Sequence, residues 1–482
     1  MNNLQATSML INGELVQAAS GKTLDSVNPA TEEVIGRIPA GGQADVEAAV
    51  AAAARAQADW AKTEMDERAA RLRAVAARVA ARADEILQIE VRDTGNTISK
   101  MQGDVGMGIK VLEYYAGLGL ELKGSTIPAS QGHLHFTLRE PYGVVGRIIP
   151  FNHPVMFALS RMAAPLMAGN SIVIKPPETS SLSAGILAEI CRDELPAGLV
   201  NIITGTGAEA GAALVRHRQV KRLAFIGSVP TGLAIQRAAA EVCVKHVSLE
   251  LGGKNPMIIF PDVDPEVAAT AAVSAMNFAW QGQSCGSCSR LLLHDDIHDD
   301  VLRRIVEKTE QLVIGDPLDP QSQMGPMNSR MQLDKVEHYV RTAHEDGARL
   351  MTGGERPEGS RFERGYWFKP TVFAGVSPKT RIGHEEIFGP VLSVFRWRDE
   401  QEALQIANST EYGLTAAIWT NDLNKATRMM RGVKAGYVWI NGYSAHHLGT
   451  PFGGMGNSGL GREEGIEELL SYTENKTVHL KL

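Results

Sequence analysis

Cys285 lies in a run of small and amide residues that is typical of a loop, Phe278-Ala-Trp-Gln-Gly-Gln-Ser-Cys-Gly-Ser-Cys-Ser-Arg290. Glu250 lies upstream in Ser248-Leu-Glu-Leu-Gly-Gly-Lys-Asn-Pro256, where a short strand-like run meets two glycines. A thiolate is a strong nucleophile, and a nearby carboxylate can activate water for a second half-reaction. A single cysteine is as often a buried apolar residue. The two segments together predict a nucleophile with its base.

The size and charge of the chain limit the kinds of protein it can be. Its 482 residues are 44% hydrophobic and include 48 glycines, so two or three α/β domains are expected. It has 48 basic and 55 acidic residues, a formal net charge of -7, and no basic block. Nucleic acid is therefore not an expected partner, because binding to phosphates needs clustered positive charge.

The cysteines and apolar segments predict a cytoplasmic protein. Four cysteines in so long a chain do not form a disulfide framework, which favours a reducing compartment. The first residues lack the basic and apolar stretches of a signal peptide. The most apolar region, Val155 to Ala168, is interrupted by Arg161 and Pro165 and is too short to span a membrane. No membrane partner is expected.

Elements that could position these residues follow from the hydrophobic periodicity. Helices are predicted from Ala44 to Trp60 and from Asp66 to about Val91, and a β-hairpin over 125–140. From residue 143 onward, short β-branched runs alternate with helical stretches, which indicates a parallel sheet covered on both sides. The runs are 143–149, 171–175, 200–204 and 222–226, with helices at 183–192, 208–216 and 231–242.

A second α/β series begins after a predicted domain boundary near residue 253, with a strand at 256–260 and a helix at 265–277. The tail, 471–482, alternates polar and apolar residues. This alternation predicts a strand that needs a partner sheet, for which another subunit is a candidate.

Eight segments in order resemble the aldehyde dehydrogenase superfamily along essentially the whole chain. They are Pro150-Phe-Asn-His-Pro154, Lys175-Pro-Pro-Glu178, Phe225-Ile-Gly-Ser228, Leu249-Glu-Leu-Gly-Gly-Lys254, Gly282-Gln-Ser-Cys285, Glu385-Glu-Ile-Phe-Gly-Pro390, Trp439-Ile-Asn441 and Pro451-Phe-Gly-Gly454. The resemblance implies oxidation of an aldehyde to a carboxylate with a nicotinamide cofactor. It also implies a Rossmann-like NAD-binding domain (1–124 and 146–253), an α/β catalytic domain (254–440) and a small antiparallel oligomerisation sheet (125–145 and 466–482), hence a homodimer or homotetramer.

The resemblance assigns catalytic roles to four residues. Cys285 would attack the aldehyde, forming a thiohemiacetal that loses hydride to become a thioester. The amide of Asn152 and the backbone N–H of Cys285 would stabilise the tetrahedral oxygen, and losing one such donor typically costs ~2.7–4 kcal/mol of barrier. Glu250 would activate the water that hydrolyses the thioester. Glu463 matches a carboxylate that assists proton relay, and a glutamate at a helix start is an equally good interpretation.

For the cofactor, the resemblance points to NAD. Gly227 and Ser228, between a strand and a helix, suit a pyrophosphate, although no GxGxxG fingerprint is present. Lys175 and Glu178 would bind the adenosine ribose, where a carboxylate repels the 2′-phosphate of NADP. Glu386 and Phe388 would hold the nicotinamide ribose. The other residues expected at this site are Ile148, Ile149, Pro150, Phe151, Gly207, Phe225 and Leu251.

The predicted substrate tunnel departs from the usual pattern of the family. By resemblance it is lined by His153, Phe157, Ser160, Ser284, Tyr443 and His446. Ser160 replaces a frequent tryptophan and Arg161 a frequent lysine. Because arginine stays charged, a proton-relay role at that position is not favoured. The lining fits an aromatic or polar aldehyde better than a short alkyl one, and the lack of an arginine placed to bind a substrate carboxylate speaks against dicarboxylic semialdehydes.

Three other functions fit parts of the sequence. A coenzyme A-acylating relative generally lacks the base that Glu250 would supply. A non-catalytic nucleotide-binding protein of the same fold has no need of Cys285, Glu250 and Asn152 together. A thiol hydrolase would need no nucleotide site. The pair Cys285-x-x-Cys288 is compatible with a redox pair or half a metal site, but without a nearby histidine cluster no metal is predicted.

Overall fold

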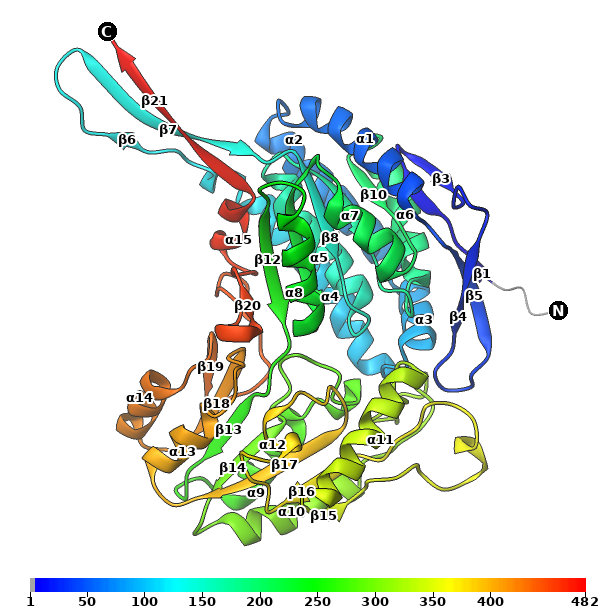
Figure 1. The fold of residues 1–482 in the computed structure, drawn as a ribbon, viewed down its shortest axis with the longest axis vertical. Helices are drawn as coiled ribbons and strands as arrows, with labels where there is room; N and C mark the ends of the chain where they lie inside the picture. The colour runs from blue at the N-terminus through cyan, green and yellow to red at the C-terminus, as the bar shows by residue number, and fades with distance from the viewer. Residues whose placement is uncertain (1–4) are drawn as a thin grey trace.

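The computed structural model describes residues 5–482 and has the predicted mixed α/β architecture. Two sheets flanked by helices lie one above the other in Figure 1, and a narrow arm of antiparallel strands projects from the upper part and carries the C-terminus. None of the helices within the described residues is long and apolar enough to cross a membrane.

The first sheet has eight strands, and its five central strands run parallel. Helices connect these strands, which confirms the predicted strand–helix alternation: α5 (Pro154–Met167), α6 (Leu182–Glu194), α7 (Ala212–Arg216) and α8 (Val229–Ala240). The strand order is β20 (Gly459–Leu460), β12 (His246–Leu251), β11 (Val220–Gly227), β8 (Val144–Ile148), β9 (Ser171–Lys175), β10 (Val200–Ile202), β2 (Met9–Ile11) and β3 (Glu14–Val16).

The N-terminal helices cover this sheet directly or through α5 and α6, and one of them differs from its prediction. The long helix expected over 66–91 is two helices, α2 (Met65–Ala81) and α3 (Ala83–Thr94), with a break at Arg82. The Arg82 guanidinium binds Glu85 and, across to α6, Glu189. The others are α1 (Gln43–Trp60) and α4 (Ile98–Gly117), and a small sheet joins β1 (Gln5–Ala6), β5 (Val34–Pro39) and β4 (Thr23–Val27).

The second sheet has seven strands, of which only the edge strand β15 is antiparallel to its neighbour. Buried apolar clusters fill both of its faces. Its order is β15 (Arg349–Thr352), β16 (Thr371–Ala374), β17 (Val391–Trp397), β14 (Arg290–His294), β13 (Pro256–Ile259), β18 (Thr415–Trp419) and β19 (Tyr437–Ile440). Its main helices are α9 (Pro265–Ala275), α10 (His298–Glu310), α11 (Arg330–Glu345), α13 (Glu400–Ala407) and α14 (Leu423–Gly432).

The arm seen in Figure 1 is a third, three-stranded sheet. The tail forms β21 (Thr473–Lys481), which pairs antiparallel with β7 (His133–Pro141) over nine residue pairs, and β7 also pairs with β6 (Thr126–Ile127). The predicted hairpin and tail strand are therefore both present. The pairing partner of the tail lies in the same chain, because β7 offers it a strand of equal length.

The predicted domain boundaries remain a prediction. One segment that they leave unassigned, 441–465, supplies β20, which completes the edge of the first sheet beside β12.

Candidate active site

One asparagine, Asn255, anchors the loop that carries Cys285. The loop lies between the 3₁₀ turn η3 (Phe278–Trp280) and β14. The side-chain amide of Asn255 donates to the carbonyls of Cys285 (2.6 Å) and Ser287 (2.9 Å), while its Oδ1 accepts from the N–H of Thr415 (3.1 Å). Gly282 has φ +67°, and a side chain there would lie 2.2 Å from the Gly389 carbonyl oxygen, so only glycine fits.

Glu250 projects from the end of β12, between Ile226 of β11 and Gly459 of β20. It is 4% exposed, and neither carboxylate oxygen has a hydrogen-bond partner within the described chain. Burial, reinforced by the negative charge of Glu463, raises the pKa of Glu250 to about 7. A carboxylate with this pKa can both take up and release a proton near neutral pH.

The thiol of Cys285 is neutral in this arrangement. Burial raises the pKa of Cys285 well above its usual value, and the nearby Glu250 carboxylate raises it further. A neutral thiol is a weak nucleophile, so attack requires that a base take its proton. Glu250 is the carboxylate that lies beside it.

Asn152 approaches the same place from the first sheet. It precedes helix α5, where Pro154 occupies the first turn and fixes the entry of the chain. Its backbone carbonyl accepts a hydrogen bond from the side chain of Asn96 (2.8 Å), whereas its own Oδ1 is buried without a partner in the described chain. The side chain is thus positioned by its backbone and available to a ligand.

On one side of Cys285 and Glu250 lies a cavity of about 120 Å³ that contains most of the residues predicted at the nicotinamide end. The rings of Phe151 and Phe388 meet edge to face at 5.8 Å, and Phe388 has an unusual φ of +56°. The Glu386 carboxylate accepts from the N–H of Gly253 (3.0 Å). The predicted residues in the lining are Pro150, Phe151, Asn152, Gly227, Ser228, Leu251, Glu386 and Phe388.

The remaining predicted cofactor residues lie outside this cavity. Glu178 accepts a hydrogen bond from the N–H of Gly207 (3.0 Å). Lys175, at the end of β9, is buried, and burial lowers its pKa to about 8 while Glu178 opposes the change. Three more predicted cofactor residues belong to the sheet and its core. Ile148 and Phe225 are paired neighbours in the sheet, and Ile149 is buried in the core.

On the other side of Cys285 and Glu250 lies a larger cavity of about 400 Å³. Five of the six predicted substrate residues line it: His153, Phe157, Ser160, Ser284 and His446. The sixth, Tyr443, is not part of this lining. Positive φ angles at Asn441 (+50°) and Ser444 (+50°) turn the chain so that Ser444 faces the cavity, while Tyr443 stacks on Trp419 in a separate surface depression.

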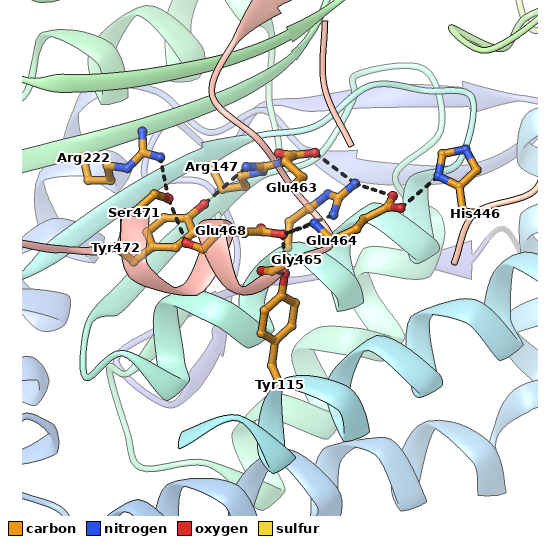
Figure 2. A network of polar contacts seen from close by, with 11 residues as sticks. Tyr115, Arg147, Arg222, His446, Glu463, Glu464, Gly465, Glu468, Ser471 and Tyr472 are labelled. Carbon is orange, nitrogen blue, oxygen red and sulfur yellow. Dashed lines mark hydrogen bonds and ion pairs between the residues drawn. The ribbon is translucent and has the colours of Figure 1, made fainter. Parts of the chain in front are cut away.

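Glu463 belongs to a buried network of charges next to this cavity, shown in Figure 2. Its oxygens contact the guanidinium groups of Arg147 (2.5 Å) and Arg161 (2.9 Å). Although burial opposes ionisation, these arginines lower the pKa of Glu463. Arg161 also lies 3.4 Å from Glu464 and 3.6 Å from Glu468. Such pairing favours a fixed anion, so the proton-relay role of Glu463 stays a prediction.

With this geometry established, comparison with known proteins gives the family. The sequence model of the aldehyde dehydrogenase family matches residues 15–478. The chain belongs to the aldehyde dehydrogenase family. Its members are NAD(P)-dependent oxidoreductases, so this chain is an enzyme of that class.

Three relatives illustrate the similarity. The aldehyde dehydrogenase tropH of Talaromyces stipitatus is 45% identical over 465 residues, which are 95% of this chain and 90% of the relative. The NAD⁺ complex of an aldehyde dehydrogenase from Bacillus cereus has a TM-score of 0.96 at 38% identity, covering 99% and 97% of the two chains. Betaine aldehyde dehydrogenase from Staphylococcus aureus, in complex with NAD⁺, has a TM-score of 0.97 at 34% identity, covering 99% and 95%.

Sequence reasoning missed several residues of this aldehyde dehydrogenase. Asn255 directly follows the motif Leu249–Lys254, so its position beside the motif was a usable signal. Lys335 and Gln332 reach the smaller cavity from α11, and Asp104 and Trp280 line the larger one. Nothing local marks these four, because only the packing of distant elements brings them to the site.

The remaining cysteines of this aldehyde dehydrogenase are placed apart from the chemistry. All four cysteines are free, and Cys288 is buried in the core of the second sheet. Burial raises the pKa of Cys288 to about 12. Within residues 5–482, no group of three or more histidine, cysteine or acidic side chains is arranged to hold a metal ion.

Proposed function

We propose that this enzyme oxidises an aromatic or polar aldehyde to the carboxylate with NAD, through a thioester on Cys285. The observation that carries the proposal is the position of Cys285 and Glu250. They are the two residues common to the linings of the larger and the smaller cavity, so they lie where the two cavities meet. A reaction that passes hydride between two bound molecules needs its nucleophile at such a junction.

The smaller cavity and its surroundings fit the cofactor. Ser228 precedes the twelve-residue helix α8, whose N-terminus favours a pyrophosphate. Lys175 and Glu178 would hold the adenosine ribose, and Glu386 and Phe388 the nicotinamide ribose. The negative charge of Glu178 favours NAD over NADP. Two similar structures hold NAD⁺, which supports this choice. When bound, the nicotinamide ring supplies the hydride acceptor.

The residues of the chain account for the other steps. Glu250 takes the proton of the Cys285 thiol, and the sulfur then adds to the aldehyde carbon. The amide of Asn152 and the N–H of Cys285 donate hydrogen bonds to the oxygen of this adduct. Glu250 then releases the thiol proton to solvent. After hydride has left the adduct, the ionised Glu250 removes a proton from a water molecule that attacks the thioester carbonyl. The carboxylate product leaves, and the sulfur takes up a proton to restore the thiol.

The alternatives have less support. Coenzyme A acylation does not need a buried carboxylate base, yet Glu250 lies beside the thiol with a raised pKa. A non-catalytic nucleotide-binding protein would not need the coincidence of Asn152, Cys285 and Glu250 around one point. Analysis of the product, free acid or acyl-coenzyme A, distinguishes the first alternative.

We further infer that the protein is cytoplasmic and that the arm joins subunits into a homodimer or homotetramer. Its strands expose Leu134, Leu138 and Leu480, an apolar row that is unusual on a projecting sheet. We expect deletion of 473–482 to lower the molar mass measured by light scattering to that of a smaller assembly. An unchanged mass would contradict a role of the arm in assembly.

Replacement of the nucleophile tests the function. Cys285→Ala should abolish NADH formation from aldehydes and leave NAD binding, measured by calorimetry, intact. Cys288→Ala is the matched control, since that cysteine packs in the core three residues away, and it should turn over. Retained turnover in Cys285→Ala would overturn the assignment.

A further inference from the structure

Two histidines line the larger cavity from different elements, and each is tied to a carboxylate. His153 precedes helix α5, and its Nδ1 lies 2.7 Å from Oδ2 of Asp104 on α4. His446 follows β19, and its Nδ1 lies 2.9 Å from Oε2 of Glu464. The second pair is labelled in Figure 2, where the ring stands at the end of the charged network.

These pairings define what the rings present to the cavity. A carboxylate accepts only, so each Nδ1 carries the hydrogen and donates it. The other nitrogen, Nε2, is then an acceptor on the neutral ring and a donor on the charged ring. Within the described residues, neither Nε2 has a hydrogen-bond partner in the chain. Two oriented polar atoms are therefore left for a ligand.

Three aromatic rings of the cavity wall, Phe157, Trp280 and Phe452, lie next to the two histidines. The ring of His153 meets Phe157 edge to face at 5.6 Å and lies 5.4 Å from Trp280. His446 packs against Phe452 at 4.5 Å. Ser160 keeps the space beside them open, and about 400 Å³ is room for a substituted ring. A planar ligand with polar substituents at its edge fits these walls.

The charges of the cavity do not favour an anionic substituent. The cation on its wall, Arg161, is already compensated by Glu463, Glu464 and Glu468. The lysine at the mouth, Lys100, is exposed and lies over the ring of Trp280 at 5.4 Å. A neutral hydroxyl, which both donates and accepts, pairs with a histidine in either protonation state.

We propose that His153 and His446 select ring aldehydes that carry hydroxyl groups, with each hydroxyl hydrogen-bonded to an imidazole Nε2. Asp104 and Glu464 are positioning residues that fix the two rings. This inference rests on the proposed function and names its substrate class. A ligand without hydroxyls would leave both nitrogens without a partner on the ligand, and a site built to hydrogen-bond a hydroxyl discriminates against such a ligand.

The test compares kcat/KM for benzaldehyde, its 3-hydroxy, 4-hydroxy and 3,4-dihydroxy derivatives, the 4-methoxy derivative and 4-formylbenzoate. We expect each usable hydroxyl to raise kcat/KM about tenfold, as one hydrogen bond would. The methoxy compound, which has similar size but no donor, should resemble benzaldehyde. Equal values for hydroxylated and methoxylated aldehydes would overturn the inference, and so would a preference for 4-formylbenzoate.

Variants then assign the selection to the two rings. His153→Phe and His446→Phe should each lower the ratio of hydroxylated to unsubstituted kcat/KM about tenfold, whatever the absolute rates. His153→Gln keeps a polar edge and should restore part of the ratio, which a purely structural role would not do. Asp104→Asn should lower the ratio less than His153→Phe. The exposed neighbour His447→Phe is the matched control and should keep the wild-type ratio.

The two hypotheses fail in different ways. Oxidation of benzaldehyde with no preference for hydroxyls, or a preference that survives in both phenylalanine variants, overturns this inference and leaves the proposed function standing. No NADH from any aldehyde, in a protein that binds NAD, contradicts the proposed function and with it the inference. If His153→Phe does not fold, judged by its thermal transition, the wild-type panel and His153→Gln still decide.

Discussion

Glu250 and Glu463 are two carboxylates in one active site that share burial but not chemistry. Their exposed fractions are 4% and 6%, and burial disfavours the charge of both. The pKa of Glu250 nevertheless rises to about 7, whereas that of Glu463 falls. Glu250 has no hydrogen-bond partner in the described chain, while Glu463 contacts two arginines. Partners, more than burial, decide which carboxylate can exchange a proton.

Glu463 can influence Glu250 without transferring a proton. As a fixed anion it repels the charge on Glu250 and contributes to the raised pKa of that base. Arg147 and Arg161 act in the opposite direction on Glu250. The charges of the network in Figure 2 therefore adjust the pKa of Glu250, the proposed base, in addition to the larger effect of burial.

The largest expected effect separates the two residues by activity. Glu250→Gln should lower steady-state turnover about 10²–10⁴-fold, because an amide cannot accept the proton of the attacking water. Rapid mixing should still show NADH formation in a first turnover, at a reduced rate because Glu250 also takes the proton of the Cys285 thiol. The exposed carboxylate Glu241, replaced by glutamine, is the control and should match the wild type. A normal steady rate in Glu250→Gln would mean that another base activates the water.

The second prediction concerns the stability contributed by Glu463. Glu463→Gln leaves two buried arginines with less compensating charge and should destabilise the protein by about 3–5 kcal/mol. Chemical unfolding at pH 7 measures the change. Glu266→Gln is a fitting control, since Glu266 also contacts two basic side chains, Arg304 and Lys308, but on the surface. Similar losses for the two variants would contradict the importance of burial.

Replacement of Glu250 by glutamine should stabilise the protein, whereas the same replacement at Glu463 should destabilise it. A folded-state pKa of about 7, above the ordinary 4.5, means that ionised Glu250 destabilises the fold at high pH. Glu250→Gln should therefore stabilise the protein by about 3 kcal/mol at pH 8. The gain should shrink as the pH falls from 7 and vanish below about 4.5, where the carboxyl is protonated in both states. A thermal transition that does not rise at pH 8 would count against the raised pKa.

The smallest effect tests the influence of the arginine. Where thioester hydrolysis limits the rate, kcat should rise with pH and level off above about 7, as Glu250 ionises. Arg161 lowers the pKa of Glu250, so Arg161→Met should move the midpoint of this profile upward. Arg161→Lys keeps the charge and should leave the midpoint closer to that of the wild type. A downward shift in Arg161→Met would contradict the electrostatic account.

Local sequence patterns were sufficient to predict part of the fold and part of the site. Cys285, Glu250 and Asn152 each lie beside a turn or strand end that sequence makes visible, and the parallel strands coincide with β-branched runs. The break at Arg82 was not visible, because arginine continues an alanine-rich helical pattern well. Contacts from Arg82 to Glu189 of another helix accompany the break, and no local pattern contains them.

The larger cavity shows the same limit. His153 was predicted to line it, but its partner Asp104 was not, because 49 positions separate the two residues. Arg161 and Glu464 are separated by 303 positions. The family resemblance placed Tyr443 in the tunnel wall, whereas in the structure, with positive φ angles at Asn441 and Ser444, Ser444 lines the cavity and Tyr443 does not. Hydrogen-bond partners across elements and the direction of a side chain in a loop depend on tertiary packing that one sequence does not display.

The short strand β20 has a consequence for how the enzyme comes into being. The strand that carries Glu250 receives its outer neighbour from Gly459 and Leu460, which are synthesised long after it. Until then β12 is an open sheet edge, ready to pair with other chains. A nascent or prematurely terminated polypeptide that has already folded its first sheet would contain the proposed nucleophile and base. The edge of that sheet at β12 would still be unpaired and prone to aggregation. Pairing with β20 covers this edge beside Glu250 and so protects it from pairing with other chains.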